Sequence, residues 1–220
     1  MIIAIDGKAG TGKSTTAKSL AKKLNYTYID TGAMYRAVAY FCFKNNVVIT
    51  EENLDKYIND IDIQIKYIDG EQKLFLNGED ITKYLRIKEV NDRASEVAVI
   101  GSVRDKLVSL QRKMGETGNV VMDGRDIGTV VFPNAEVKIF TETDIEERVK
   151  RRIKEYAEKG VVMTAEDLRA NMLKRDKIDS ERAHSPLKKA DDAILLDTTN
   201  LTLEEVVEKI VEIVKEKEER

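Results

Sequence analysis

Residues 7–16 spell GKAGTGKSTT and decide the fold, because Gly7 to Ser14 match the phosphate-binding pattern G-x-x-x-x-G-K-[ST] in full. The apolar run 2–6 precedes the stretch, and residues 13–24 follow it with apolar side chains at helical spacing. A glycine-rich turn between a strand and a helix directs backbone N–H groups toward an anion at the positive end of the helix. An ordinary turn has no need of a lysine and a serine at its last two positions, so the stretch predicts a nucleotide phosphate site.

Within this stretch, Lys13 supplies a cation near a transferred phosphate, and the hydroxyl of Ser14 can ligate Mg²⁺. We therefore expect ATP and Mg²⁺ as cofactors, with Ser14 as the metal ligand. The expected ATP-binding residues are Gly7, Lys8, Ala9, Gly10, Thr11, Gly12, Lys13, Ser14 and Thr15.

Length and charge narrow the class of protein further. With 220 residues the chain can form one domain of moderate size, and its net charge of −3 argues against general affinity for nucleic acid or anionic membranes. Cys42 is the single cysteine, which favours a reducing compartment. No apolar run is long enough for a signal segment or a membrane span, so we expect a cytoplasmic protein.

The order of strands and helices predicts a three-layer α/β/α fold. Five apolar runs indicate the strands of a parallel core sheet, at 2–6, 26–29, 119–122, 137–140 and 193–196. Between Ile61 and Ile81 the apolar residues alternate with polar ones around two turns, 69–70 and 77–78, which predicts a small antiparallel meander. The meander indicates an inserted subdomain.

Helices are expected between and after these strands. Thr31 is the expected N-cap of a helix that runs through Phe41, with Asp30 and Gly32 marking the turn. Charged helices are expected at about 144–158 and 164–178, and an amphipathic helix from Leu203 onward should close the chain.

Arginines follow turn residues along the chain, where ligands of open α/β sheets gather. Arg36 and Arg125 follow the second and third core strands, and Arg175, Asp179 and Arg182 share a face if their helix continues. Each arginine alone could be half of a surface salt bridge. The charge run 146–152 could likewise be a solvated helix face or a mobile lid that carries arginines over reacting phosphates.

The single histidine, His184, bears on the class of acceptor. A kinase acting on a hydroxyl needs a base for its proton, whereas a phosphate acceptor supplies an oxygen that is already ionised. Many arginines without an evident base favour a nucleoside monophosphate acceptor, and we assign His184 no role. A switch GTPase would show an N-K-x-D segment, and a motor would need a larger second module; the sequence has neither.

Taken together, these motifs resemble the bacterial cytidylate kinases, the (d)CMP kinases among the P-loop nucleoside monophosphate kinases. The resemblance runs over nearly the whole chain and is most specific at 7–15, 30–36, 123–133 and 175–182. It implies transfer of the γ-phosphoryl of ATP to CMP or dCMP by a single domain, 1–220. That domain would have a core (1–30, 111–145 and 166–220), an inserted monophosphate-binding region (31–110) and a helical lid (146–165). We expect a monomer.

The resemblance also implies roles for residues outside the phosphate-binding stretch. Arg36, Arg125 and Arg182 correspond to residues that hold the acceptor phosphate; Ser95, Arg104 and Asp126 to those that read cytosine; Asp179, with Arg175 nearby, to the ribose contact. The expected substrate-binding set is completed by Thr31 and Tyr35. The expected catalytic residues are Lys13, Arg125, Arg148, Arg152 and Arg182.

A carboxylate and an arginine suit cytosine because its amino group donates and its N3 accepts, while uracil reverses both polarities. Asp126 would therefore repel uracil, unless it only caps the loop after the third strand. Two alternatives stay open: a small P-loop kinase with a different monophosphate or metabolite as acceptor, and a nucleotide-dependent switch that binds tightly without turnover.

Overall fold

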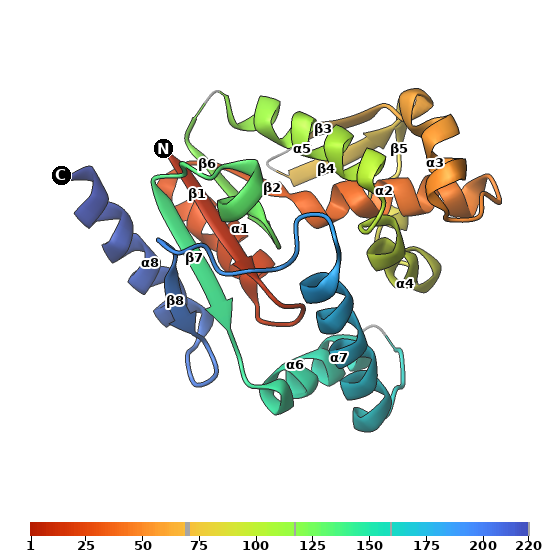
Figure 1. Cartoon of the computed structure of the whole chain (residues 1–220). Coiled ribbons are helices and arrows are strands. Elements are labelled where there is room, and N and C mark those ends of the chain that lie inside the picture. The colour runs from red at the N-terminus through yellow and green to blue at the C-terminus, as the bar shows by residue number, and fades with distance from the viewer. Residues whose placement is uncertain (69–70, 117, 159, 220) are drawn as a thin grey trace. The chain divides into compact units, whose positions relative to one another are not determined.

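The computed structural model describes residues 1–68, 71–116, 118–158 and 160–219. The chain divides into two compact units (Figure 1), one formed by Met1–Tyr28 with Thr117–Arg220 and the other by Ile29–Glu116. The second unit contains all of 31–110, the region that the family resemblance implies to be an insertion.

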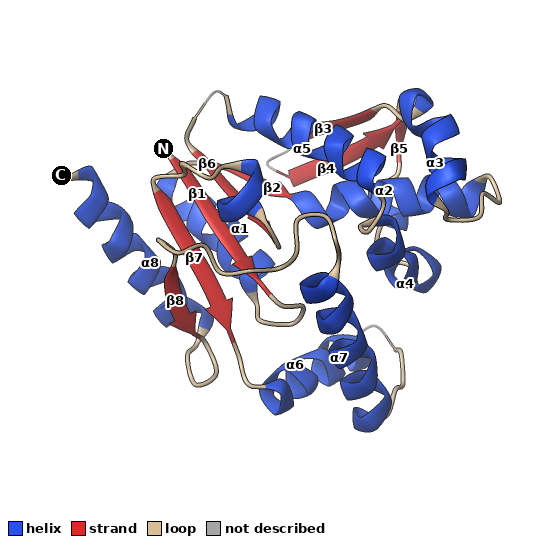
Figure 2. Ribbon diagram, viewed as in Figure 1, coloured by secondary structure: helices blue, strands red, loops and turns tan. Residues whose placement is uncertain are grey.

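The first unit is organised around a five-stranded parallel sheet of order β2-β6-β1-β7-β8 (Figure 2). β1 lies in the middle and pairs in parallel with β6 and β7. The predicted core sheet is therefore confirmed, because each strand overlaps its predicted range. The strands are β1 (Ile2–Gly7), β2 (Thr27–Asp30), β6 (Val120–Gly124), β7 (Val137–Glu142) and β8 (Ile194–Asp197).

Two helices, α1 (Lys13–Leu24) and α8 (Leu203–Glu218), pack on each other and on this sheet. Their apolar stripes bury a core with the strands, including Leu20, Ile139 and Ile210. α8 begins with a capping box in which Thr202 and Glu205 each accept the backbone N–H of the other. The predicted closing helix is thus confirmed and sits in the core.

The helices α6 (Ile145–Glu158) and α7 (Ala165–Glu181) pack against each other around a small apolar core of Val149, Leu168 and Met172. α7 extends three residues beyond the predicted end at 178. That extension carries Asp179 on the helix and places Arg182 at its C-cap.

The second unit consists of a three-stranded antiparallel sheet, β3-β4-β5, with helices packed beside it. The predicted meander is confirmed. Its predicted turn at 69–70 lies outside the described residues. At its other turn, Asn77 and Gly78 both have positive φ, as a tight hairpin requires. Cys42 is fully buried in the core of this unit. The elements are α2 (Thr31–Lys44), α3 (Glu51–Tyr57), β3 (Ile63–Ile68), β4 (Glu71–Leu76), β5 (Glu79–Asp80), α4 (Lys88–Val97) and α5 (Gly101–Gly115), with short 3₁₀ turns at Ile58–Asp60 and Thr82–Tyr84.

The expected N-cap of α2 is wrong by one residue. Asp30 is the cap, since its Oδ1 accepts the N–H of Ala33 at 3.0 Å, and Thr31 is the first helical residue. A carboxylate at this position stabilises the positive end of the helix more strongly than a hydroxyl does.

Within the described part of the chain, every helix is too short or too polar to cross a lipid bilayer.

Candidate active site

The loop between β1 and α1 is held in place by its glycines and by Thr11. A Cβ on Gly7 would lie 2.3 Å from Oγ1 of Thr141, so only glycine fits there. Gly10 and Gly12 have φ of 81° and 84°, conformations that favour glycine. The hydroxyl of Thr11 lies 3.0 Å from that of Thr141 on β7, which anchors the loop to the sheet. The sequence 7–14 therefore folds into a closely packed loop ahead of the α1 N-terminus.

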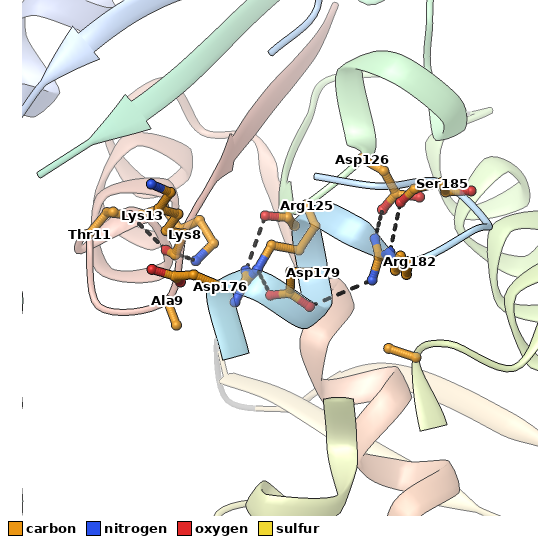
Figure 3. Close-up of polar contacts among 12 residues, drawn as sticks. Lys8, Ala9, Thr11, Lys13, Arg125, Asp126, Asp176, Asp179, Arg182 and Ser185 are labelled. Carbon is orange, nitrogen blue, oxygen red and sulfur yellow. Dashed lines mark hydrogen bonds and ion pairs between the residues drawn. The ribbon is translucent and has the colours of Figure 1, made fainter. Parts of the chain in front are cut away.

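Lys13 is the buried cation of this loop. Its Nζ donates to the carbonyl of Lys8 at 3.0 Å, inside the curve of the loop (Figure 3). Burial, together with the nearby positive charge of Arg125, lowers the pKa of Lys13 to about 7, although Asp123 opposes the shift. A phosphate bound in the loop would place a negative charge next to this ammonium group and favour its protonated form.

Ser14 and Asp123 provide the oxygen ligands that Mg²⁺ prefers. The Ser14 hydroxyl donates to Oδ2 of Asp123 at 2.6 Å, while Oδ1 accepts from the hydroxyl of Tyr28 at 2.8 Å. Among the described residues, no cluster of three His, Cys, Asp or Glu side chains could hold a metal by itself. Because Mg²⁺ is commonly held by one or two protein oxygens together with substrate phosphates, this donor pair fits the ion.

Four charged residues form a connected network beside the loop (Figure 3). Nε of Arg125 donates to Oδ2 of Asp179 at 2.8 Å. Arg182 lies between two carboxylates, with its nitrogens 3.8 Å from Asp179 and 3.9 Å from Asp126. The carbonyl of Ser185 accepts from Nε of Arg182 at 2.8 Å and fixes its orientation.

In the ion pair between Arg125 and Asp179, burial and the opposite charge have opposing effects on the pKa of each side chain. Burial alone would raise the pKa of Asp179, but Arg125 and Arg175 hold it below its usual value. Burial alone would also lower the pKa of Arg125, and Asp179 reverses this. Asp179 is therefore a buried carboxylate and not part of a solvated surface salt bridge.

Asp126 is buried at the position before the single π-helical turn Ile127–Val131, and its side chain makes no capping hydrogen bond there. The alternative role of a loop cap is thus unsupported. Its carboxylate faces Arg182 instead.

The two lid arginines of the sequence analysis have different surroundings on α6. Arg148 is buried, donates to the carbonyl of Ala9 and pairs with Asp176 of α7. Arg152 is partly exposed, pairs with Glu155 at 2.7 Å and lies over the ring of Tyr156. The charge run 146–152 is consequently only in part a solvated face.

The second unit holds the remaining predicted substrate residues. Arg36 pairs with Asp30 at 2.8 Å, next to the N-terminus of α2. Arg104 is buried, donates to the carbonyl of Ala98 at 3.0 Å and lies 5.3 Å over the ring of Tyr35. Ser95 is half-buried on α4, and Thr31 is buried at the start of α2.

Three aspartates of the first unit take part in the site without having been assigned a role from the sequence: Asp6, Asp123 and Asp176. Asp6 and Asp123 each precede a glycine at the carboxyl end of a buried strand, and this repeated Asp-Gly could have drawn attention to both. Asp176 has no comparable signal. His184 is exposed in the loop that follows α7.

The chain has a complete phosphate-binding loop after the first strand of a parallel sheet, with its lysine and with a serine and aspartate pair beside it. These features place the chain among the P-loop nucleotide-binding proteins. A family model described as cytidylate kinase matches residues 3–216, and the chain belongs to this family of enzymes.

Curated relatives agree with this family. The chain is 50% identical to the cytidylate kinase of Bacillus subtilis (strain 168) over 216 residues, which cover 98% of this chain and 96% of that one. It is also 50% identical to the cytidylate kinase of Fusobacterium nucleatum over 208 residues, 94% of each chain. A solved structure of an uncharacterized protein from Eubacterium ventriosum superimposes with a TM-score of 0.54 at 16% identity over 98% of both chains, a likeness of fold.

Proposed function

We propose that the protein transfers the γ-phosphoryl group of ATP to CMP or dCMP, giving ADP and CDP or dCDP. One observation carries the proposal beyond family membership. Asp6 of β1 is in register with Gly124 of β6, so the phosphate-binding loop and the Arg125–Asp126 segment leave neighbouring parallel strands at the same sheet edge. This arrangement supports binding of the donor phosphates at the loop and of the acceptor phosphate at the Arg125–Asp126 segment, both of which belong to the first unit.

The chemistry requires charge neutralisation and alignment rather than a base. The acceptor phosphate is already ionised, and Arg36, Arg125 and Arg182 would bind it while Lys13 binds the donor phosphates. Mg²⁺ held by Ser14 and Asp123 would neutralise charge on the donor phosphates. Arg148 and Arg152 belong to the proposed lid, 146–165, which would exclude water and suppress hydrolysis of ATP.

The base and the sugar would be read by separate groups. Asp126, Arg104 and Ser95 suit the donor and acceptor edge of cytosine, and Asp179 with Arg175 suits the ribose. Thr31 and Tyr35 complete the acceptor site. Cytoplasmic location, a monomeric state and the absence of a nucleic-acid partner stay predictions from the sequence.

A coupled assay of ADP release with CMP, UMP, AMP and shikimate tests the proposal. We expect CMP to give the highest ratio of kcat to KM. An equal or higher ratio with UMP would reject the cytosine assignment, and the highest ratio with AMP or shikimate would favour the alternative of another small P-loop kinase. Tight ATP binding without turnover on any acceptor would favour a switch.

A further inference from the structure

We infer that Asp6 is a positioning residue that holds the Arg125–Asp126 segment in its acceptor-binding geometry, an inference that rests on the proposed function. Its Oδ1 accepts the N–H of Ile127 at 2.9 Å, and its Oδ2 accepts that of Gly128 at 2.8 Å. Asp6 is only 5% exposed. Both oxygens of a buried carboxylate therefore serve the backbone of one loop.

These two hydrogen bonds fix the residues that follow Asp126. The carbonyl of Asp126 in turn accepts the N–H groups of Val130 at 2.8 Å and Val131 at 3.1 Å, which closes the turn Ile127–Val131. The backbone around Asp126 is thus constrained from β1 on one side and by its own turn on the other. The directions of the Arg125 and Asp126 side chains depend on that backbone.

The space for a side chain at Gly128 is tight. A Cβ there would lie 3.2 Å from Cδ of Lys138 and 3.4 Å from Oδ2 of Asp6. Lys138 cannot move away freely, because its Nζ is bound to both oxygens of Asp192 at 2.8 and 2.9 Å. The loop therefore packs closely against both Asp6 and Lys138.

Asp6 also lies next to the donor loop. It directly precedes Gly7, the first residue of the donor loop, and its own carbonyl accepts from the Thr141 hydroxyl at 3.2 Å. One residue thus ties the start of the donor loop to the acceptor segment. Burying a carboxylate is costly unless it is fully hydrogen-bonded. Burial raises the pKa of Asp6 to about 7, against the opposing effect of the N–H groups of Gly128 and Ile127. A costly carboxylate whose two oxygens accept backbone N–H groups of this loop is consistent with a positioning role, since small displacements in an active site reduce turnover strongly.

Asp6→Asn tests the inference, because the amide keeps the shape of the carboxylate but turns an NH₂ group toward one of the two N–H donors. We expect the KM for CMP to rise about tenfold and the preference for CMP over UMP, as the ratio of their kcat/KM values, to fall about tenfold, with the KM for ATP changed less than about threefold. Equilibrium titration with CMP alone, followed by calorimetry, should show the same loss of affinity. Ile5→Val, a fully buried neighbour on β1, controls for a general loss of stability and should leave the preference unchanged.

Gly128→Ala approaches the same contact from the loop and decides the matter if Asp6→Asn does not fold. It should reproduce the defect in CMP binding and in the CMP over UMP preference. A wild-type protein that shows no preference for CMP would reject the proposed function itself. If wild type prefers CMP and a folded Asp6→Asn or Gly128→Ala variant keeps that preference in full, the role of Asp6 is overturned while the proposed function stands.

Discussion

Arg148 and Asp176 form a buried ion pair with two parallel hydrogen bonds, Nη1 to Oδ2 at 2.7 Å and Nη2 to Oδ1 at 3.0 Å. The third nitrogen, Nε, donates to the carbonyl of Ala9 at 2.8 Å. One guanidinium group therefore connects α6, α7 and the phosphate-binding loop. Arg148 thus links the proposed lid helix α6 to α7 and to the phosphate-binding loop.

Asp176→Asn should destabilise the protein markedly, because it leaves the charge of Arg148 buried without its carboxylate. We expect the free energy of unfolding, measured by urea denaturation, to fall by about 3–5 kcal/mol. Asp92→Asn is the matched control: Asp92 pairs with Lys88 at 2.8 Å on an exposed helix face, and its loss should cost less than about 1 kcal/mol. Equal losses in the two variants would show that the buried pair contributes nothing special.

The burial of Arg148 illustrates what the sequence can and cannot predict. Apolar periodicity and the phosphate-binding pattern predict the five-stranded sheet, the meander and the helices α1, α2, α6, α7 and α8, since these depend on residues near one another in the chain. The helices α3, α4 and α5 of the second unit are not predicted. The charge run around Arg148 fits a lid and a solvated face equally well, and its partner Asp176 lies on another helix. Only the packing of α6 on α7 shows that Arg148 is buried rather than solvated.

The aspartates of the site were missed for a related reason. Asp123 meets Ser14, and Asp6 meets Ile127, because β1 and β6 pair in one particular register. No local spacing encodes that register. The N-cap of α2 is a smaller case, where Asp30 and Thr31 are both good caps and the backbone conformation decides between them.

Lys13→Ala should nearly abolish phosphoryl transfer. It removes a buried cation from the curve of the donor loop, where charge develops in the transition state. We expect kcat for CMP to fall by at least about a hundredfold in the ADP-release assay. Lys18→Ala, an exposed lysine on the same helix, should behave as wild type. Near-normal turnover in Lys13→Ala would contradict the donor-site assignment.

Asp126→Asn should mainly change the choice between pyrimidines. An amide can donate as well as accept, so the variant loses the repulsion of uracil that a carboxylate provides. The kcat/KM ratio of CMP to UMP should fall by roughly a hundredfold, chiefly through better use of UMP and weaker use of CMP. An unchanged ratio, in a variant whose KM for ATP matches wild type, would mean that the base is read elsewhere.

The pH dependence of stability should carry a signature of Asp6. Burial raises the pKa of Asp6 from 3.8 to about 7, with the charge of Asp126 raising it and that of Arg125 lowering it. Between these two values the folded protein binds a proton that the unfolded chain does not. The contribution of Asp6 to stability is therefore fully present below pH 3.8 and is lost as the pH rises through about 7.

Asp6→Asn removes this titration. The unfolding free energy of wild type minus that of the variant should therefore decrease from pH 5 to pH 8. The decrease is up to about 1.4 kcal/mol for each pH unit below the folded pKa. Urea denaturation at pH 5, 6, 7 and 8 measures the difference directly and cancels the other titrating groups. Ile5→Val introduces no titratable change beside the same strand end, and its difference from wild type should stay constant over this range. A difference between wild type and Asp6→Asn that is constant or grows with pH would show that burial does not raise the pKa of Asp6. In that case the two N–H donors of the loop outweigh the cost of desolvating the carboxylate.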